Sequence, residues 1–401
     1  MTPSAVAARR PRIMYLEAND DGTVGGSHQA LFDLVRNLDR SRYEPVVVFY
    51  QDNVFVGRLR DAGVEVHVLE HQARTEKHTR LSGGRLAKLR VMVSAIRWRA
   101  RFLREQRVAL IHVNNSPKVG NDDWLPAARL VGVPIIAEAM GDAAAAEETN
   151  PVKRWLFRQF DHVIPISRYI ADAVARAGYP AEKASLVYLG VDIDAYRRRV
   201  CRTPAEVRRE LGVAPDKMLV AMVGNLRAWK GQSVVVEALT RMAPAVREGL
   251  HVLFIGAARA DDAPYAQSLR DAAATGGVSH LVSFLGGRTD APDLVNAADV
   301  ALHASTRPEP FGLVVIEAMA VGKAVVAADS GGPAEILTSE SGVTYDVRRP
   351  EQLAAALTRL VEDPGHRAAL GAAALARVDE FSIHRTVEGR VRVYEKLLGK
   401  K

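Results

Sequence analysis

Apolar residues in this chain form short runs that alternate with longer stretches of mixed polarity. Each short run is followed by a polar or glycine-rich turn. Within the longer stretches, apolar residues recur every three or four positions, as they do in residues 27–38. The runs predict buried strands and the stretches predict helices with one apolar face. Strands that alternate with helices are typical of parallel sheets covered by helices. We therefore expect an α/β protein.

The predicted strands fall into two series, separated by a polar and basic segment near 190–199. The first series comprises residues 12–16, 45–49, 64–69, 109–113, 134–137, 162–165 and 185–188. The second comprises residues 218–223, 251–255, 282–284, 300–302, 324–327 and 343–345. We expect two Rossmann-like domains, 1–197 and 198–380, and a C-terminal helix within 381–401 that packs back on the N-terminal domain.

Composition narrows the class of protein. With 401 residues, 48% hydrophobic and 25% charged, the chain is too long for one typical core and has the balance of a folded globular protein. The single cysteine, Cys201, excludes an intrachain disulfide and a cysteine-rich metal site. No apolar run reaches the ~20 residues of a membrane span, and no secretory signal is visible. We expect a cytoplasmic protein.

The net charge of +7 indicates anionic partners, and the excess is concentrated. Between Arg80 and Arg107 there are nine basic residues and one acidic residue, Glu105. Apolar residues at three- and four-residue steps, such as Leu89 and Val93, predict one helix face there. Either this helix covers a domain with a solvated basic side, or it rests on anionic lipid.

The densest chemical signal lies between residues 308 and 320. Pro308 and Pro310 hold Glu309 in a loop, and a helix is expected to begin near Gly312. Free backbone N–H groups at a helix start bind anions or sugar hydroxyls, and glycine allows close approach. Glu317 follows on an otherwise apolar helix face, where ribose hydroxyls would satisfy its carboxylate.

This stretch resembles the signature of the retaining glycosyltransferases of family 4, which have the GT-B fold. Other segments are similar to that family at residues 25–26, 166–167, 190–192, 223–226, 230–231, 284–286 and 331–335. The resemblance extends from about residue 12 to 360 and is more specific in the second half. It implies two Rossmann-like domains whose parallel sheets face each other across a cleft, with the donor held mainly by the second domain.

The resemblance also implies roles in donor binding. Glu309 would bind the transferred sugar, Glu317 the ribose, and Lys230 the diphosphate on which charge develops. Family members place an arginine where this chain has Asn225, and we expect Arg227 to reach the same phosphate. The expected catalytic residues are Glu309 and Lys230. The expected donor-binding residues are Gly26, Asn225, Arg227, Lys230, Leu285, Gly286, Glu309, Phe311, Gly312, Leu313 and Glu317.

The acceptor side is less defined, because many family members carry a histidine where this chain has the segment around Met140. Polar residues near strand ends are candidates for the acceptor side, and each is equally interpretable as a cap or turn residue. These candidates are Gly25, His28, His112, Asn114, Glu138 and Asp142. Two acidic pairs, Asp20-Asp21 and Asp122-Asp123, are interpreted as caps or turns rather than metal ligands.

The resemblance thus implies retaining transfer from a nucleoside diphosphate sugar, of UDP or GDP, without metal or prosthetic group. The leaving phosphate would help to deprotonate the acceptor, a hydroxyl of a glycan, glycolipid or polysaccharide intermediate. A lipid-linked acceptor would place the enzyme on the inner face of a membrane. The alternatives are a nucleotide-sugar epimerase or glycan phosphorylase of the same fold, and a basic nucleic-acid-binding protein. The sequence leaves the oligomeric state open.

Overall fold

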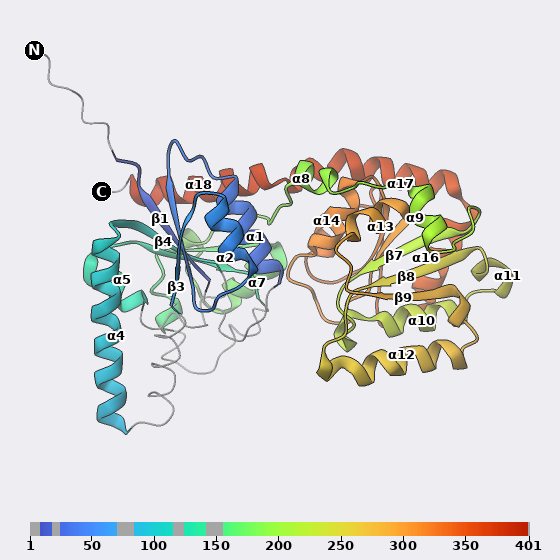
Figure 1. The fold of residues 1–401 in the computed structure, drawn as a ribbon, viewed down its shortest axis with the longest axis horizontal. Helices are drawn as coiled ribbons and strands as arrows, with labels where there is room; N and C mark the ends of the chain where they lie inside the picture. The colour runs from blue at the N-terminus through green and yellow to red at the C-terminus, as the bar shows by residue number, and fades with distance from the viewer. Residues whose placement is uncertain (1–8, 18–24, 70–83, 115–123, 142–154, 400–401) are drawn as a thin grey trace, which may run out of the picture. The chain divides into compact units, whose positions relative to one another are not determined.

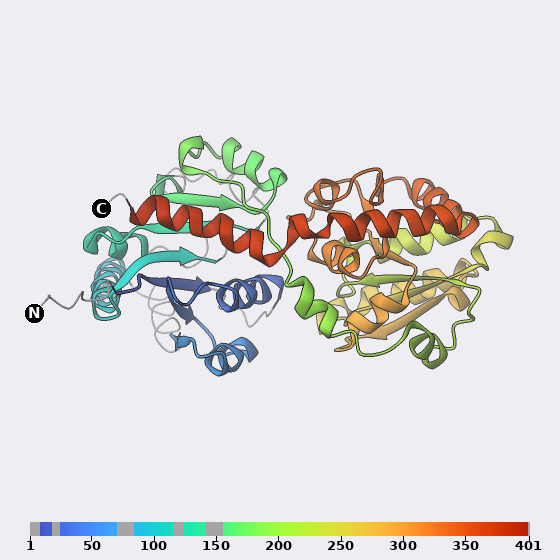
Figure 2. The same cartoon turned by 90° about the horizontal axis from the view of Figure 1, so that it is seen from above.

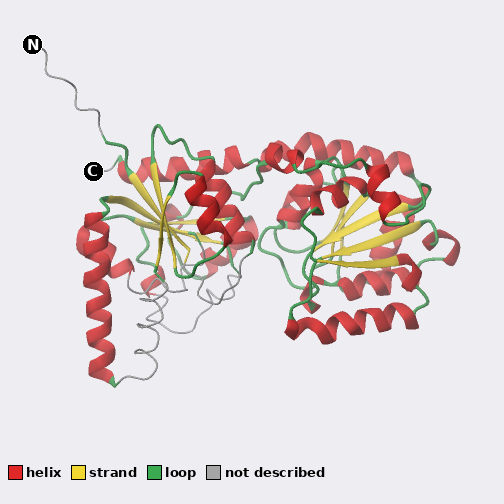
Figure 3. Cartoon of the chain, in the orientation of Figure 1, coloured by secondary structure: helices red, strands yellow, loops and turns green. Residues whose placement is uncertain are grey.

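The computed structural model describes residues 9–17, 25–69, 84–114, 124–141 and 155–399. Internal contacts divide the chain into two compact units. Unit 1 comprises Met1–Leu189 and Ile383–Lys401, and unit 2 comprises Gly190–Ser382. Each unit contains a six-stranded parallel sheet flanked by helices (Figures 1 and 3). The predicted α/β class with two Rossmann-like units is confirmed.

The unit 1 sheet has the strand order β3-β2-β1-β4-β5-β6. Its strands are β1 (Arg12–Glu17), β2 (Glu44–Phe49), β3 (Glu65–Val68), β4 (Val108–Val113), β5 (Ile135–Ala139) and β6 (His162–Pro165). Its helices are α1 (Gly26–Arg36), α2 (Val54–Asp61), α4 (Arg85–Glu105), α5 (Trp124–Val131), α7 (Arg168–Arg176) and α18 (Ile383–Leu398). Strand β1 is buried at every position, which explains its nearly continuous apolar sequence.

The unit 2 sheet has the order β12-β11-β10-β7-β8-β9. Its strands are β7 (Met218–Val223), β8 (Leu250–Ile255), β9 (Val282–Gly286), β10 (Val300–His303), β11 (Ala324–Ala328) and β12 (Val343–Tyr345). Its helices are α8 (Ile193–Arg198), α9 (Pro204–Glu210), α10 (Gln232–Arg241), α11 (Pro244–Arg247), α12 (Ala263–Thr275), α13 (Ala291–Ala297), α14 (Leu313–Ala320), α15 (Pro333–Ile336), α16 (Pro350–Glu362) and α17 (Pro364–Arg377).

The two sheets share one topology. In each, the first strand of the unit lies beside both the second and the fourth, so the order of connection reverses next to it. In unit 2 this reversal lies between β7 and β10. Ligands of open parallel sheets bind at such a reversal, beyond the carboxyl ends of the strands. The topology therefore predicts a ligand-binding site at the loops that follow β7 and β10.

Two sequence expectations about unit 1 need revision. Residues 185–188 were expected as a strand, but they form none, although Ser185 N and Val187 N each donate to a carbonyl of β6 or its end. The division between units falls at Leu189 and not at residue 197. The reason is that α8 packs on α14, with Arg197 Nε donating to Ala320 O at 2.8 Å.

Helix α18 joins unit 1, alongside its sheet and helix α1 (Figures 1 and 2). Ile383, Val387, Val393 and Tyr394 enter the same core cluster as β1 and β2. A Cβ at Gly389 would lie 2.4 Å from a methyl carbon of Val187, so glycine permits this close packing. Within the described ranges, no helix combines the length and apolar character needed to cross a membrane.

Candidate active site

The candidate site lies at the carboxyl ends of β7 and β10 in unit 2. The loop after β7 carries Lys230 and the loop after β10 carries Glu309. These loops are joined where Thr306 N donates to Trp229 O at 2.8 Å. Gly231 has φ 78°, and a Cβ there would lie 1.8 Å from Ala304 O. Only glycine fits this crossing, and it brings the Lys230 loop against the Glu309 loop.

Glu309 is the centre of a cluster of hydrogen bonds. Lys230 Nζ donates to both of its carboxylate oxygens, at 3.0 and 2.9 Å. His303 Nε2 and Ser305 Oγ each lie 2.8 Å from Oε2. Because a carboxylate only accepts, His303 Nε2 is the donor of this hydrogen bond. The two expected catalytic residues are thus in direct contact in this structure.

The cluster keeps Glu309 ionised. Its side chain is only 17% exposed, and burial alone would raise its pKa. The hydrogen bond and charge of His303 and the charge of Lys230 outweigh burial and hold the pKa of Glu309 well below its usual value. The site therefore presents a carboxylate that accepts hydrogen bonds from hydroxyl groups, beside a lysine that can bind phosphate.

A third loop, after β11, supports the Glu309 loop from the side. Gly332 N donates to Glu309 O at 2.9 Å, and Gly331 forms a bridge with Glu309. A Cβ at Gly331 would lie 2.3 Å from that carbonyl oxygen, and one at Gly332 would lie 2.3 Å from Phe311. The glycine pair therefore allows the two loops to stack backbone on backbone.

Helix α14 begins directly after this loop. Its N-cap, Gly312, has φ 106° and provides no side-chain cap. The first N–H groups of a helix have no partner within it, so those of Leu313 and its neighbours can bind an anionic or hydroxyl group. Binding through the backbone of residues 311–313 stays a prediction. One turn into α14, half-buried Glu317 lies near Tyr196 of α8, and burial together with that negative charge raises the pKa of Tyr196.

The other expected donor residues of unit 2 lie at the same edge of the sheet. Asn225 is exposed, and its carbonyl oxygen accepts from buried Gln232 at 3.0 Å. Arg227 was expected to reach a phosphate, but its Nε donates to Asp262 at 3.1 Å. Leu285 and Gly286 end β9, partly exposed.

The expected acceptor-side residues of unit 1 prove to be largely internal. His28 is 3% exposed and stacks on Phe49, with ring centroids 6.0 Å apart. Buried Asn114 donates to Glu17 at 2.7 Å and to Ser27 O at 3.1 Å, which ties β4 to β1 and α1. These contacts occupy both side chains, so the structure does not support direct contact with an acceptor.

His112 and Glu138 are also misassigned, because they belong to a buried network that holds α18. Glu138 is 1% exposed and pairs with Arg390 of that helix, and His112 Nε2 lies 3.2 Å from the same carboxylate. Tyr394 Oη lies 2.6 Å from His112 Nδ1. Burial would raise the pKa of Glu138, but the charge of Arg390 and the bond to His112 lower it to about 2.

Of the remaining unit 1 residues, Gly25 and Gly26 are exposed at the start of α1. Gly25 is the N-cap, with extended backbone and no side-chain cap, so this helix start also offers free N–H groups. Asp142 and both acidic pairs, Asp20-Asp21 and Asp122-Asp123, lie outside the described residues. Nothing in the described segments gathers three or more acidic, histidine or cysteine side chains into a metal site.

Sequence reasoning missed His303 and Ser305. A signal was available, because both stand at or just beyond the end of the predicted strand at 300–302, six and four residues before Glu309. Side chains at the carboxyl ends of parallel strands meet at one edge of the sheet. Their hydrogen bonds to Glu309 Oε2 fix the orientation of the carboxylate.

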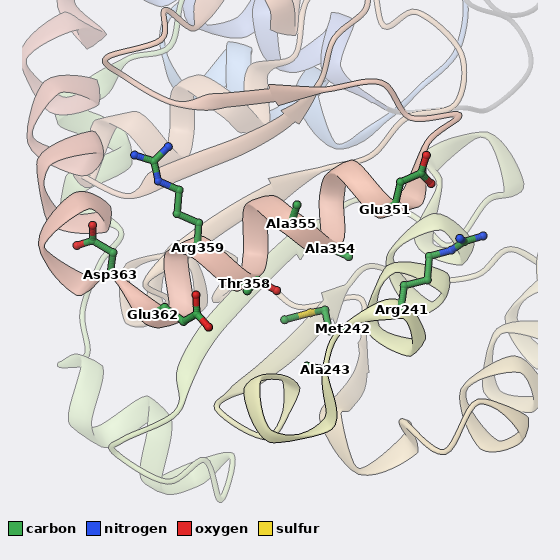
Figure 4. A pocket seen from close by; sticks show the side chains of 10 residues that line it. All are labelled: Arg241, Met242, Ala243, Glu351, Ala354, Ala355, Thr358, Arg359, Glu362 and Asp363. Carbon is green, nitrogen blue, oxygen red and sulfur yellow. The ribbon is translucent and has the colours of Figure 1, made fainter.

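A separate groove of about 540 Å³ lies on the helical layer of unit 2 (Figure 4). Its lining comes from α16 and from the segment around the end of α10, including Met242 and Thr358. None of the predicted site residues lines this groove. Its open rim carries both signs of charge, such as Arg359 and Glu362, which gives no preference for an anionic nucleotide.

Both units match families of known proteins. The family described as "Glycosyl transferases group 1" matches residues 205–377, and "Glycosyl transferase 4-like domain" matches residues 25–190. A D-inositol 3-phosphate glycosyltransferase of Salinispora arenicola is 33% identical, over 69% of this chain and 66% of the relative. The enzyme of the same name from Actinosynnema mirum is 32% identical, over 69% of each chain. The alignments thus cover about two thirds of these relatives.

Solved structures share the fold over nearly the whole chain. HepE of Anabaena, crystallised with UDP, superposes with a TM-score of 0.78 at 24% identity, covering 96% of this chain and all of its own. A glycosyltransferase of Rickettsia africae gives a TM-score of 0.82 at 16% identity, covering 98% and 100%. At these identities the similarity establishes the architecture.

Proposed function

Because the chain belongs to the group 1 glycosyltransferases and has their GT-B architecture, we propose that its unit 2 site holds a nucleoside diphosphate sugar and that the enzyme transfers the sugar with retention. The single observation that carries this proposal is the contact of Lys230 with Glu309, at the point where the sheet connection reverses. The fixed carboxylate can accept hydrogen bonds from a sugar, and the lysine and the uncapped helix start can bind a diphosphate.

The geometry supports a distinct role for each group. Lys230 leaves Glu309 to bind the diphosphate, where its charge stabilises the negative charge that grows as the bond to the sugar breaks. The freed carboxylate oxygens of Glu309, still fixed by His303 and Ser305, accept hydrogen bonds from sugar hydroxyls. The acceptor oxygen forms the new bond to the anomeric carbon as the bond from that carbon to the diphosphate breaks. The leaving phosphate receives the proton of the acceptor hydroxyl.

UDP is the first donor base to test, since HepE, which has the same architecture, was crystallised with UDP and with UDP-glucose. GDP remains the second. We propose a glycan, glycolipid or polysaccharide intermediate as acceptor. Named relatives act on an inositol phosphate and in lipopolysaccharide core biosynthesis, the latter from Rhizobium meliloti at 29% identity. A lipid-linked acceptor would require the enzyme at a membrane surface.

The donor proposal predicts a thermal shift that depends on Glu317. UDP, GDP, ADP and their common sugar conjugates are added without metal to the wild type and to Glu317→Ala. One nucleotide class should raise the melting temperature of the wild type, because a ligand that binds only the folded state stabilises it by mass action. The shift should be smaller in Glu317→Ala, since a ribose contact is lost.

The matched control is Glu351→Ala, which removes an exposed glutamate from α16 of the same unit. It should keep the full shift. An equal shift in Glu317→Ala and Glu351→Ala would refute the ribose role. No shift with any nucleotide at millimolar concentration would contradict donor binding by unit 2 in the absence of acceptor.

A further inference from the structure

Helix α4 of unit 1 divides into two halves with different surroundings. In the C-terminal half, Ala95, Arg99, Ala100, Phe102 and Leu103 are buried, and the helix packs on α5. In the N-terminal half, four apolar side chains are exposed to solvent. Their exposed fractions are 73% for Leu86, 51% for Leu89, 42% for Met92 and 40% for Val93.

The exposed residues continue the face that the other half uses for packing. Leu86, Leu89 and Val93 follow one another at steps of three and four residues, which places them on one side of a helix. Ile96, Ala100 and Leu103 extend the same row towards the core. The apolar row therefore runs beyond the core of unit 1, and no described residue buries its outer part. Figure 1 shows this end of α4 extending past the strands of the unit.

Basic side chains border the exposed row. Lys88 and Arg90 lie among its members in sequence, and Arg97, Arg101 and Arg104 follow, all exposed. The only acidic residue of the helix is Glu105 in its last turn, where it pairs with Arg101 at 2.6 Å. The outer half of α4 thus combines an apolar strip with positive charge that no acidic residue in the described segments is seen to pair.

We propose that the outer half of α4 docks on an anionic membrane surface, with Leu86, Leu89, Met92 and Val93 entering the boundary between headgroups and acyl chains. The flanking Lys88 and Arg90 bind lipid phosphates. A helix with an apolar strip, a basic border and low overall hydrophobicity lies in the plane of the membrane interface in this way. This docking surface is separate from the unit 2 donor site, and its test does not depend on the identity of the donor.

Charge and apolar exposure together favour lipid over other anionic partners. Nucleic acid is bound through phosphate contacts from basic groups and gains little from exposed leucine and methionine side chains. A second copy of this chain would bring the same basic residues against each other, which is unfavourable at short range. Anionic lipid satisfies both features of the surface, because its phosphates pair with the basic residues and its acyl chains take up the apolar strip.

Vesicle flotation tests the proposal directly with the full-length protein. Wild type should float with vesicles of phosphatidylcholine and phosphatidylglycerol and much less with phosphatidylcholine alone. Each basic residue near the surface contributes about five-fold in partitioning, so Lys88→Glu/Arg90→Glu should bind more than ten-fold more weakly. Leu86→Ser/Leu89→Ser/Val93→Ser should lose more than ten-fold as well, through lost apolar burial.

Two variants serve as matched controls. Arg36→Glu/Arg176→Glu makes the same change in net charge on α1 and α7, and Leu130→Ser removes an exposed leucine from α5. Both should float like the wild type. The surface variants should also melt like the wild type, because the changed side chains are exposed. Weakened flotation in the controls, or unchanged flotation in both α4 variants, would overturn the proposal.

A fluorescent probe distinguishes insertion from other associations. In Cys201→Ser/Leu89→Cys the introduced thiol carries a dye whose emission moves to shorter wavelength in apolar surroundings. Anionic vesicles should shift the emission, and the same dye at Leu130→Cys should not respond. A shift that appears with RNA instead of vesicles would assign the surface to nucleic acid. A shift that appears on concentrating the protein alone, with a dimer by light scattering, would assign it to a second copy.

Discussion

Replacing Lys230 by methionine is expected to lower the rate of sugar release from the donor by about 10²–10³-fold or more, the loss found when one preorganised donor to a developing negative charge is removed. Lys230 is 18% exposed on its side chain and bonded to both oxygens of Glu309, so its ammonium group is already positioned. Methionine keeps the length of the side chain but cannot neutralise the diphosphate.

The rate is measured as release of the nucleoside diphosphate into water from the nucleotide sugar that gives the largest thermal shift. The fold should survive, because His303 and Ser305 continue to bind Glu309. Arg227→Met is the control, since its guanidinium is engaged by Asp262 and should affect the rate less. Equal losses in both variants, or none in Lys230→Met, would contradict the assignment.

Replacing Arg390 by methionine is expected to destabilise unit 1 by about 3–5 kcal/mol, because it leaves the carboxylate of Glu138 buried without its ion-pair partner. The packing of α18 on the sheet should be weakened most, because Arg390 and Tyr394 connect this helix to the buried network on β4 and β5. Urea unfolding at neutral pH measures the change. The double variant Glu138→Gln/Arg390→Met should recover part of the stability, as the buried charge is gone.

The destabilisation should depend on pH with a definite sign. In the wild type the pKa of Glu138 is lowered to about 2, so its favourable contribution is complete above the usual pKa and is lost only as the pH falls towards 2. In Arg390→Met, burial raises the pKa of Glu138 above its usual value, and the folded protein takes up a proton. The loss of stability relative to the wild type should therefore be smallest near pH 2 and grow as the pH rises. A pH-independent loss would show that packing, rather than charge, explains the effect.

Much of the candidate site was predictable because it is encoded locally. Local sequence is enough to predict the strand before residue 224, the turn at Gly231 and the loop that the prolines form around Glu309. Each of these features depends only on residues that are close together along the chain. Both segments were predicted as loops, and each follows a predicted strand of the second series. The structure places Lys230 and Glu309 in contact, at 2.9 Å.

The polar residues of unit 1 show where this reasoning ends. His28, His112 and Glu138 have the sequence context of ligand-binding residues at strand and helix ends, but all three are buried. What buries His112 and Glu138 is α18, whose Arg390 is 252 positions from Glu138 along the chain. No local pattern reports a partner at that distance.

The sequence by itself determined the alternation of strands and helices, the two Rossmann-like units, the loops that carry Lys230 and Glu309, and the helix that carries Glu317. These features depend on periodicity, proline and glycine within short windows. Only the tertiary structure decided which polar groups are internal, that His303 and Ser305 orient Glu309, and that the described residues leave one end of α4 uncovered. These features depend on which segments, distant in sequence, exclude water from one another, and that exclusion exists only when the chain is folded.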